Sequence, residues 1–297
     1  MAETVRSLLR AHDRVSLHAL AYSHGWSQLL PMLWDEDAGV LYRTEQLADK
    51  VVELELRQAD DVALELTVLS EATLSDTDRD ELVAGARWML ALDEDLEKFY
   101  ELCRTEPRLA HVPAEGRGRI LRSSSVFEDA VKCICTTNTT WAQTKGMVRR
   151  LVERLGEPSP ISDGRAFPTP HAIAVAGEGV LQNDVRLGYR SPYVHQLAEQ
   201  VTAGELDLEA LRFSSQSTAE LRKQLLKIKG IGPYAAASLL ILLGRYDYIG
   251  VDSWARKLVS KQFYGGHPVS DKDIQSAFDS FGQWRALAYY SYRWDEM

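Results

Sequence analysis

The first quarter of the chain alternates short apolar runs with turn sequences. Val52, Leu54 and Leu56 are each followed by a charged residue, and this period of two is the pattern of a half-buried strand. The Ala-Asp-Asp stretch at 59–61 is typical of a hairpin turn and leads into a second apolar run. We therefore expect an antiparallel sheet within residues 15–70.

From about Ser75 the apolar spacing changes to steps of three and four residues, which is the period of an amphipathic helix. Ser75 or Asp76 provides an N-cap, and acidic residues follow in the first turn. Two further helices are predicted to meet near Thr137–Thr140. We predict an α+β fold, mainly α, in which an N-terminal antiparallel β-sheet layer packs on a helical body. The predicted domains are a sheet-plus-helix unit at 1–115 and the helical body at 116–297.

Composition narrows the class of protein. Hydrophobic residues make up 45% and charged residues 26%, which is an ordinary globular mixture. No apolar run is long enough to cross a bilayer, and the N-terminus has no apolar signal core, so we expect no membrane association and a cytoplasmic location. The sparse set of Cys103, Cys133 and Cys135 favours buried thiols in a reducing compartment over a disulfide framework.

The net charge of −9 argues at first against a nucleic-acid partner. Its distribution is uneven, however: residues 1–115 contain 11 Lys/Arg and 24 Asp/Glu (net −13), and residues 116–297 contain 23 and 19 (net +4). Because local potential governs binding to a polyanion, the second part can face DNA while the first faces solvent. An acidic surface of no special meaning is the alternative, so charge permits DNA binding without showing it.

Residues 221–259 carry the most informative sequence. A helical pattern ends at Gly230-Ile231-Gly232, where glycine tolerates positive φ and lets a second backbone approach closely. Pro233 then suits the first turn of the next helix. The unpaired N–H groups at the start of that helix, with the positive end of its dipole, suit a phosphate oxygen. A plain helical hairpin with a glycine turn is the alternative.

Asp252 comes after an apolar run and directly before a predicted helix at 253–263. In an enzyme that cuts the bond between a base and its sugar, departure of the base leaves a sugar with oxocarbenium character. A fixed anion near that sugar, such as the Asp252 carboxylate, stabilises the charge or orients water. The alternative is a simple N-cap, worth about 1 kcal/mol. The two roles are compatible, because one oxygen can cap the helix while the other faces a pocket.

These residues carry a family resemblance. KIKGIGPYAAASLLILLG followed by VDSW resembles the helix-hairpin-helix (HhH-GPD) DNA glycosylase superfamily, whose members have a Gly-hydrophobic-Gly hairpin and a catalytic Asp further along. Residues 121–156 resemble the region of 8-oxoguanine DNA glycosylases where an Asn fills the gap left by the flipped base, and Asn138 matches it. In LGYRSPYV, which resembles the family's Gly-Tyr-Arg segment, Tyr189 would wedge the duplex and Arg190 would contact the unpaired base. The N-terminal sheet agrees with the layer shared by 8-oxoguanine and inducible 3-methyladenine glycosylases.

The resemblance implies a set of site residues, with Asp252 as the catalytic residue. The expected base pocket comprises Tyr234, Ser238, Trp254, Trp284 and Tyr290. The expected DNA-binding residues are Gly230, Gly232, Asn138, Gln143, Tyr189, Arg190 and Lys229. No cofactor is expected to be required. Family hairpins often hold a monovalent cation, Na⁺ or K⁺, through backbone carbonyls, which here would be those of Leu226, Ile228 and Ile231.

Departures from the family pattern bear on the reaction. Members that also nick the strand carry a Schiff-base Lys at the position where this chain has Tyr234. The lysines of this chain near the hairpin lie before the turn and do not match that position: Lys223, Lys227 and Lys229. No cysteine follows Cys135, so the four-Cys iron–sulfur cluster of the endonuclease III branch is excluded.

The base-reading Gln of the 8-oxoguanine branch is replaced by Ala286, while Tyr290 occupies the aromatic position. An aromatic pocket without that Gln favours stacking on a cationic, alkylated purine. Core packing at helical spacing is the alternative for Trp284, Tyr289, Tyr290 and Tyr292.

We therefore predict a monofunctional DNA glycosylase of base excision repair that hydrolyses the N-glycosidic bond of a damaged purine of the 3-methyladenine type. The alternatives are an 8-oxoguanine DNA glycosylase with or without lyase activity, and a non-catalytic HhH DNA-binding protein. The predicted partner is double-stranded DNA containing damaged bases. The chain is expected to act as a monomer and, if bacterial, to associate with the nucleoid.

Overall fold

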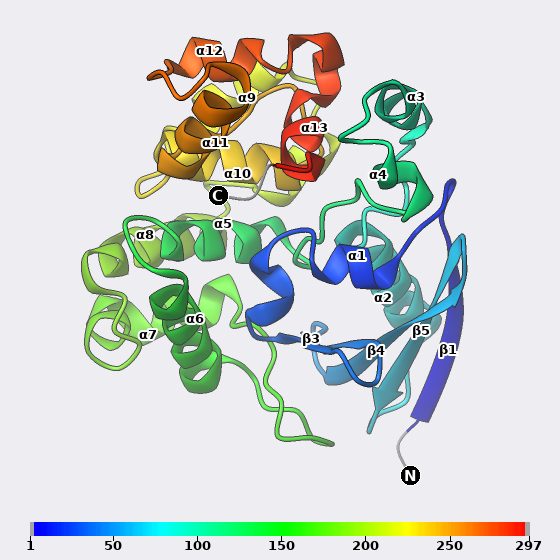
Figure 1. Cartoon of the computed structure of the whole chain (residues 1–297). Coiled ribbons are helices and arrows are strands. Elements are labelled where there is room, and N and C mark those ends of the chain that lie inside the picture. The colour runs from blue at the N-terminus through cyan, green and yellow to red at the C-terminus, as the bar shows by residue number, and fades with distance from the viewer. Residues whose placement is uncertain (1–2, 295–297) are drawn as a thin grey trace.

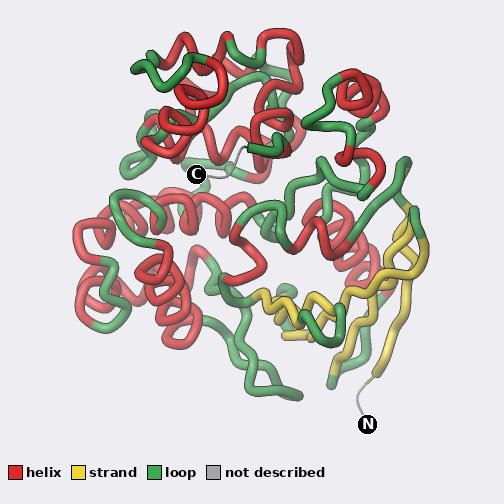
Figure 2. Tube along the Cα trace, in the orientation of Figure 1, coloured by secondary structure: helices red, strands yellow, loops and turns green. Residues whose placement is uncertain are grey.

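A computed structural model describes residues 3–294. The N-terminal sheet occupies one corner of the molecule, the α5–α8 helices lie beside it, and the α9–α13 helices form a third group above both (Figure 1). Strands are confined to the first part of the chain, and the named elements after β5 are all helices, joined by loops (Figure 2). The predicted fold class, mainly helical with an N-terminal antiparallel sheet, is confirmed.

The elements have the following bounds. The strands are β1 (Glu3–Arg10), β2 (Met32–Asp35), β3 (Val40–Gln46), β4 (Val51–Asp60) and β5 (Ala63–Ser70). The α-helices are α1 (Leu17–Ala21), α2 (Asp76–Met89), α3 (Glu97–Thr105), α4 (His111–Ala114), α5 (Val126–Cys135), α6 (Trp141–Leu155), α7 (Pro170–Asn183), α8 (Ser191–Thr202), α9 (Thr218–Leu225), α10 (Pro233–Leu242), α11 (Ser253–Phe263), α12 (Asp271–Ser276) and α13 (Arg285–Ser291). The 3-10 helices are η1 (Gly25–Gln28), η2 (Gly188–Arg190), η3 (Glu209–Phe213) and η4 (Asp279–Trp284).

The sheet has five strands in the order β1-β5-β4-β3-β2, with antiparallel pairing throughout. The predicted alternation in β4 is confirmed: Leu54 and Leu56 are buried, whereas Glu53 and Glu55 are partly exposed. The predicted hairpin between β4 and β5 is confirmed as well, with Asp60 opposite Ala63. Burial of one face of the sheet fixes its register, because a slip of one residue would expose every apolar side chain of the strand.

Side-chain caps define where the main helices begin. Ser75 caps α2 and forms a capping box with Asp78, as the sequence predicts. Helices α5 and α6 meet across 136–140, which is the predicted junction. Thr140 caps α6 in a second capping box. The N-terminal boundaries of α2 and α6 are thus set by residues close to each start.

Long-range contacts join the sheet region to the helical body. The guanidinium of Arg43 on β3 pairs with Glu128 on α5 at 2.7 Å, and both side chains are buried. At the other end, the Arg108 guanidinium after α3 donates to the carbonyl of Arg293 at 2.9 Å. Residues on both sides of the predicted boundary at 115 therefore pack together, and the boundary itself stays a prediction.

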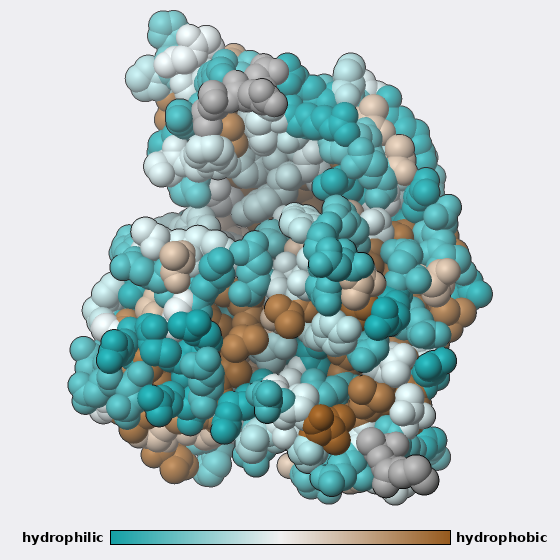
Figure 3. Space-filling model, turned by 60° about the horizontal axis from the view of Figure 1, so that its bottom comes forward, coloured by the Kyte–Doolittle hydropathy of each residue, from teal (hydrophilic) through white to brown (hydrophobic). Residues whose placement is uncertain are grey.

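The state of the cysteines matches the compositional expectation. The three cysteines are free and buried. In the part of the chain that the structure describes, no helix is long and apolar enough to span a membrane. The face in Figure 3 is largely hydrophilic and is hollowed between the group that carries α11 and α12 and the group that carries α6–α8.

Candidate active site and DNA-binding face

The two hairpin glycines have different structural roles. Gly230 has a φ of +87°, and a Cβ at this position would lie 2.8 Å from Cβ of Tyr193 on α8. Both its conformation and its packing therefore require glycine. Gly232 has an ordinary φ of −89°, and a Cβ there would meet no atom within 4 Å. Gly230 builds the turn, whereas Gly232 leaves the start of α10 open to approach from outside.

The start of α10 offers unpaired donors to that open surface. No side chain caps this helix. Pro233 has no N–H, so the first-turn donors belong to Tyr234 and Ala235. Lys227 and Lys229 are exposed on the preceding turn. Uncapped amides beside mobile cationic side chains form a surface suited to a phosphate group.

Asp252 is the N-cap of α11, as the sequence predicts. Its Oδ1 accepts a hydrogen bond of 2.7 Å from the backbone nitrogen of Ala255. Within the described residues, Oδ2 accepts no hydrogen bond, so that oxygen is available to a second partner. The loop leading to Asp252 is held by Gln275, whose side chain accepts from Ile249 N at 3.0 Å and donates to Ile249 O at 2.7 Å.

The charge of Asp252 influences the pKa values of three tyrosines. Burial raises the pKa of Tyr234, and the charge of Asp252 adds to the increase. The pKa values of Tyr289 and Tyr290 are raised in the same way, first by burial, with Asp252 and the neighbouring phenols contributing. Asp252 therefore lies close enough to act electrostatically on phenols from both α10 and α13.

A cavity of about 280 Å³ opens beside these tyrosines. Its lining includes His24, Trp26, Trp141, Tyr234, Ser238 and Tyr290. The Ser238 hydroxyl donates to the carbonyl of Tyr234 at 3.2 Å, which orients it along α10. The site thus combines aromatic walls, several hydroxyl groups and a nearby carboxylate, in a volume that suits one extruded base.

Two of the expected pocket residues lie elsewhere. Trp284 is partly buried and packs against the core, stacked on Tyr246 with ring centroids 5.9 Å apart and tilted against Phe99 at 5.8 Å. This is the core-packing alternative recognised from the sequence. Trp254 is 54% exposed in the first turn of α11, with the Lys257 ammonium 5.8 Å from its ring centroid. Neither indole lines the cavity.

The predicted wedge residues cluster at the junction of α5 and α6. Asn138 is exposed and has a φ of +44°, a left-handed conformation that asparagine tolerates. Its amide lies 3.4 Å from the hydroxyl of Tyr189, and that hydroxyl is 3.0 Å from Oγ1 of Thr137. The ring of Tyr189 is half exposed. Asn138 and Tyr189 therefore project together from one point of the surface.

Arg190 occupies a different environment. It is 6% exposed, and its guanidinium lies 4.4 Å from the centroid of the Tyr189 ring. The guanidinium donates to the carbonyls of Leu187 and Thr137. In this conformation the Arg190 guanidinium packs on the Tyr189 ring, and its N–H groups are hydrogen-bonded to backbone carbonyls. Its expected contact with an unpaired base stays a prediction that requires the side chain to leave these carbonyls.

Gln143 and Ala286 also have clear structural positions. Gln143 closes the capping box of α6, where its Oε1 accepts from the backbone nitrogen of Thr140 at 3.2 Å. It remains exposed beside the junction that carries Asn138. Ala286 is fully buried, and its backbone nitrogen donates to the carbonyl of Tyr246 at 2.8 Å.

Sequence reasoning missed the cavity wall formed by His24, Trp26 and Trp141. The first two belong to a short segment between predicted strands, and no local periodicity connects them to residues more than two hundred positions away. Trp141 could have been identified from the sequence, because it follows Asn138 closely. An aromatic residue near a residue that fills the gap left by a flipped base is a natural stacking partner. Its indole donates to Oε1 of Gln28 at 3.1 Å, which links α6 to η1.

The expected cation site has suitable donor chemistry. The carbonyl of Ile228 accepts a hydrogen bond of 3.1 Å from the backbone nitrogen of Ile231 and retains a second lone pair. Together with the carbonyls of Leu226 and Ile231, it would give Na⁺ or K⁺ the oxygen ligands that such ions take. Across residues 3–294, no cluster of three or more His, Cys, Asp or Glu side chains could hold a metal ion.

A larger cavity lies away from this chemistry. It measures about 820 Å³ and is lined by Trp88, Arg122, Arg212 and residues of β3, β4 and α2. Arg122 is paired with Glu94 and Arg212 with Glu209, so neither guanidinium is a free cation. We assign the site to the smaller cavity because Tyr234 and Tyr290, two of the three tyrosines influenced by Asp252, line it.

The chain is similar in sequence and fold to known DNA glycosylases. The chain is 27% identical over 171 residues to the DNA-3-methyladenine glycosylase of Bacillus subtilis (strain 168). The aligned stretch is 57% of this chain and 56% of that protein, so the chain spans just over half of the relative's length. The solved structure of 3-methyladenine DNA-glycosylase from Archaeoglobus fulgidus superposes with a TM-score of 0.76 at 20% identity, covering 96% of this chain and 97% of that one.

The 8-oxoguanine glycosylase/lyase of Clostridium acetobutylicum in its apo form gives a TM-score of 0.74 at 22% identity, covering 98% of this chain and 97% of that one. At these identities the two structures establish the shared fold. Residues 131–282, more than half of the chain, match the sequence profile of the HhH-GPD superfamily base excision DNA repair proteins. The chain belongs to the HhH-GPD superfamily of base excision DNA repair proteins.

Proposed function

We propose that the protein is a monofunctional DNA glycosylase that flips a damaged purine, preferably an alkylated one of the 3-methyladenine type, and hydrolyses its N-glycosidic bond. One observation carries the proposal. The charge of Asp252 acts on Tyr234 and Tyr290, and these same two side chains line a cavity of about 280 Å³. A carboxylate whose charge acts on the side chains of a base-sized aromatic pocket supports glycosidic cleavage at this site.

The two oxygens of Asp252 divide the work. Oδ1 is held by the Ala255 amide, which fixes the orientation of the carboxylate at the start of α11. Oδ2 then faces the reacting sugar, where its negative charge stabilises positive charge developing at C1′ as the bond to the base breaks. The same oxygen can orient the water that attacks C1′. The clamp of Gln275 on Ile249 keeps the loop that carries Asp252 in place.

The walls of the cavity favour a cationic ring. Alkylation at a ring nitrogen gives a purine nucleoside a positive charge, and aromatic faces attract cations. Trp26, Trp141, Tyr234 and Tyr290 supply such faces. Raised pKa values keep the tyrosines neutral, so they do not compete with Asp252 as anions.

Double-stranded DNA is the proposed partner. The open start of α10 with Lys229 beside it would hold the backbone of the damaged strand, and Asn138 with Tyr189 would enter the gap left by the flipped base. A monovalent cation on the carbonyls of Leu226, Ile228 and Ile231 would add positive charge at the same place. The Clostridium acetobutylicum protein of the same fold has been solved with double-stranded DNA containing 8-oxoG opposite cytosine, which supports this partner.

Excision of 8-oxoguanine is the second candidate function. The exposed Asn138–Tyr189 pair favours it, since this is the feature that resembles 8-oxoguanine glycosylases. Tyr234 in place of the Schiff-base lysine and the buried Ala286 in place of the base-reading Gln oppose it.

A screen of released bases tests the proposal. Duplexes that each carry one defined lesion are incubated with excess protein, and free bases are separated by chromatography. Release of 3-methyladenine without strand cleavage is the expected result. Release of 8-oxoguanine alone would favour the second candidate. Tight duplex binding with no released base from any lesion would favour a non-catalytic HhH DNA-binding protein.

A further inference from the structure

His24 contributes a polar ring to the wall of the cavity. Its Nε2 lies 2.5 Å from the carbonyl oxygen of Leu121. A carbonyl can only accept, so Nε2 carries the proton, and Nδ1 of the neutral ring is an acceptor. Within residues 3–294, no group hydrogen-bonds Nδ1. The ring therefore presents one unused acceptor beside a cavity whose other polar groups are mainly hydroxyls.

The protonation state of the ring follows from its surroundings. Burial lowers the pKa of His24 to about 4; the bond to the Leu121 carbonyl acts in the opposite direction, and the positive charge of Lys132 adds to the decrease. At neutral pH the imidazole is uncharged. A neutral ring does not repel a cationic purine, and its Nδ1 retains the lone pair that an imidazolium would lose.

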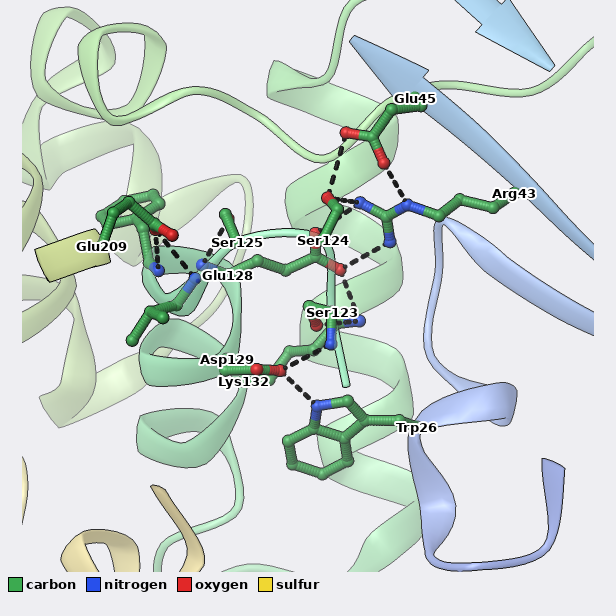
Figure 4. Close-up of polar contacts among 12 residues, drawn as sticks. Trp26, Arg43, Glu45, Ser123, Ser124, Ser125, Glu128, Asp129, Lys132 and Glu209 are labelled. Atoms are coloured by element: carbon green, nitrogen blue, oxygen red, sulfur yellow. Dashed lines mark hydrogen bonds and ion pairs between the residues drawn. The ribbon is translucent and has the colours of Figure 1, made fainter. Parts of the chain in front are cut away.

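The neighbouring indole holds this ring in position. The rings of His24 and Trp26 are tilted against each other with centroids 4.6 Å apart. The Trp26 indole donates to Oδ1 of Asp129 at 2.7 Å, and the same oxygen accepts from the backbone nitrogen of Ser123 at 3.0 Å (Figure 4). A buried carboxylate thus fixes the wall on which His24 packs.

A buried ionic network supports that carboxylate. Lys132 pairs with Glu128 at 2.6 Å, and Glu128 also receives the guanidinium of Arg43 at 2.7 Å, all three within the core (Figure 4). The network connects β3 to α5, and the Lys132 ammonium lies 6.0 Å from the centroid of the Trp26 ring. Displacing any one of these three side chains would leave a buried charge without its partner, so the wall is held rigidly. Rigid support is what a residue needs in order to read a ligand by one hydrogen bond.

We propose that Nδ1 of His24 reads the flipped base by accepting a hydrogen bond from an N–H group of that base, and that His24 thereby selects lesions that present such a donor. The inference rests on the proposed function and names the chemistry of its substrate. The exocyclic amine of 3-methyladenine provides the donor. 1,N6-ethenoadenine has no N–H on its ring system and cannot make the bond. An enzyme that uses His24 in this way discriminates against the second base.

Two substitutions separate this role from packing. In His24→Gln, the side-chain amide can still donate to the Leu121 carbonyl, and its only acceptor is an amide oxygen on a longer, flexible side chain, displaced from the position of Nδ1. His24→Phe keeps the ring against Trp26 and removes both nitrogens. His18→Gln is the matched control, because His18 is exposed and lies outside the cavity. Thermal unfolding and binding of an undamaged duplex establish that each variant is folded.

Single-turnover release of 3-methyladenine and of 1,N6-ethenoadenine is then compared. For both His24 variants we expect release of 3-methyladenine to slow about tenfold or more, the loss typical of one hydrogen bond to a charged or polar ligand. Release of 1,N6-ethenoadenine should change less than threefold, and the control should match the parent. Equal slowing on both bases would overturn the proposal in favour of packing, and unchanged release of 3-methyladenine would overturn it outright.

A spectroscopic titration separates this inference from the proposed function. In protein labelled with 15N-histidine, free 3-methyladenine should shift the Nδ1 resonance of His24 and leave that of His18 unmoved. A parent protein that releases no base but shows this shift would contradict the glycosylase activity and support the base-reading role. Saturation of the cavity with no change at Nδ1 would contradict the base-reading role.

Discussion

Oδ1 of Asp252 lies 2.7 Å from the backbone nitrogen of Ala255, so one carboxylate oxygen caps α11 and the other is left for chemistry. The two roles respond differently to substitution. In Asp252→Asn the amide oxygen still accepts from Ala255, so we expect a loss of stability below about 1 kcal/mol. The charge next to the sugar is lost, and base release should fall at least about a hundredfold.

Single-turnover release and duplex binding, measured on the same Asp252→Asn preparation, check this prediction. Binding of the lesion duplex should be retained, because the contacts to the DNA backbone are made elsewhere. Ser253→Ala, which changes an exposed neighbour, serves as the control and should release base at the parental rate. Near-normal release by folded Asp252→Asn would leave Asp252 as a cap alone.

The hairpin glycines are expected to give opposite phenotypes. Gly230→Ala places a Cβ 2.8 Å from Tyr193 at a φ of +87°, so it should destabilise the protein by about 1–3 kcal/mol. In Gly232→Leu the Cβ would meet no atom within 4 Å and φ is allowed, so stability should be unchanged. Its side chain would instead cover the α10 amides and weaken binding to damaged and undamaged duplex alike.

Urea unfolding and duplex binding at two salt concentrations distinguish the two variants. Binding by the parent should weaken steeply as salt is added, because phosphate contacts release counterions. If Gly232→Leu binds undamaged duplex as tightly as the parent, the start of α10 does not hold the DNA backbone.

Tyr234 predicts the form of the product. A lyase needs an amine that attacks the sugar, and a phenol whose pKa is raised by burial and by Asp252 is a poor nucleophile at neutral pH. The strand should remain intact with an abasic site until alkali is added, and borohydride should not trap the protein on its substrate. Strong trapping that disappears when Lys223, Lys227 or Lys229 is replaced would establish a bifunctional enzyme instead.

Elements defined by local sequence were predictable, and contacts across the fold were not. The alternation in β4, the capping box at Ser75 and the cap at Asp252 each depend on residues within a few positions, and the structure confirms them. Trp284 shows the limit, because its helical spacing fits either a pocket or a core. Only the placement of Phe99 and Tyr246 against it decides for the core.

The N-terminal wall of the cavity is a second case in which contacts with distant residues, and not local sequence, determine the structure. His24 and Trp26 acquire their positions from Leu121 and Asp129, about one hundred residues further along the chain. The buried charges behind them were unpredictable for a related reason. Arg43 in a strand and Lys132 in a helix each fit an exposed position locally, and only their joint pairing with Glu128 allows both to be buried.

The neutral state of His24 predicts an acid-sensitive fold. Burial lowers its folded pKa to about 4, whereas the unfolded value is near 6.5. Between these pH values His24 binds a proton in the unfolded chain but not in the folded protein. The free energy of unfolding therefore falls as pH decreases from about 6.5 towards 4. Between pH 6.5 and pH 5 the expected loss is about 2 kcal/mol, at about 1.4 kcal/mol for each pH unit.

Comparison with a variant isolates this contribution. Burial also lowers the pKa of His111, which adds a loss of the same sign to every variant. Glu128, with a pKa of about 2 because Arg43 and Lys132 outweigh the effect of burial, destabilises only below about pH 4.5. Urea unfolding of the parent and of His24→Gln at pH 7 and pH 5 should therefore show a pH-dependent loss smaller in the variant by about 2 kcal/mol. An identical loss in both proteins would mean that folding does not lower the pKa of His24.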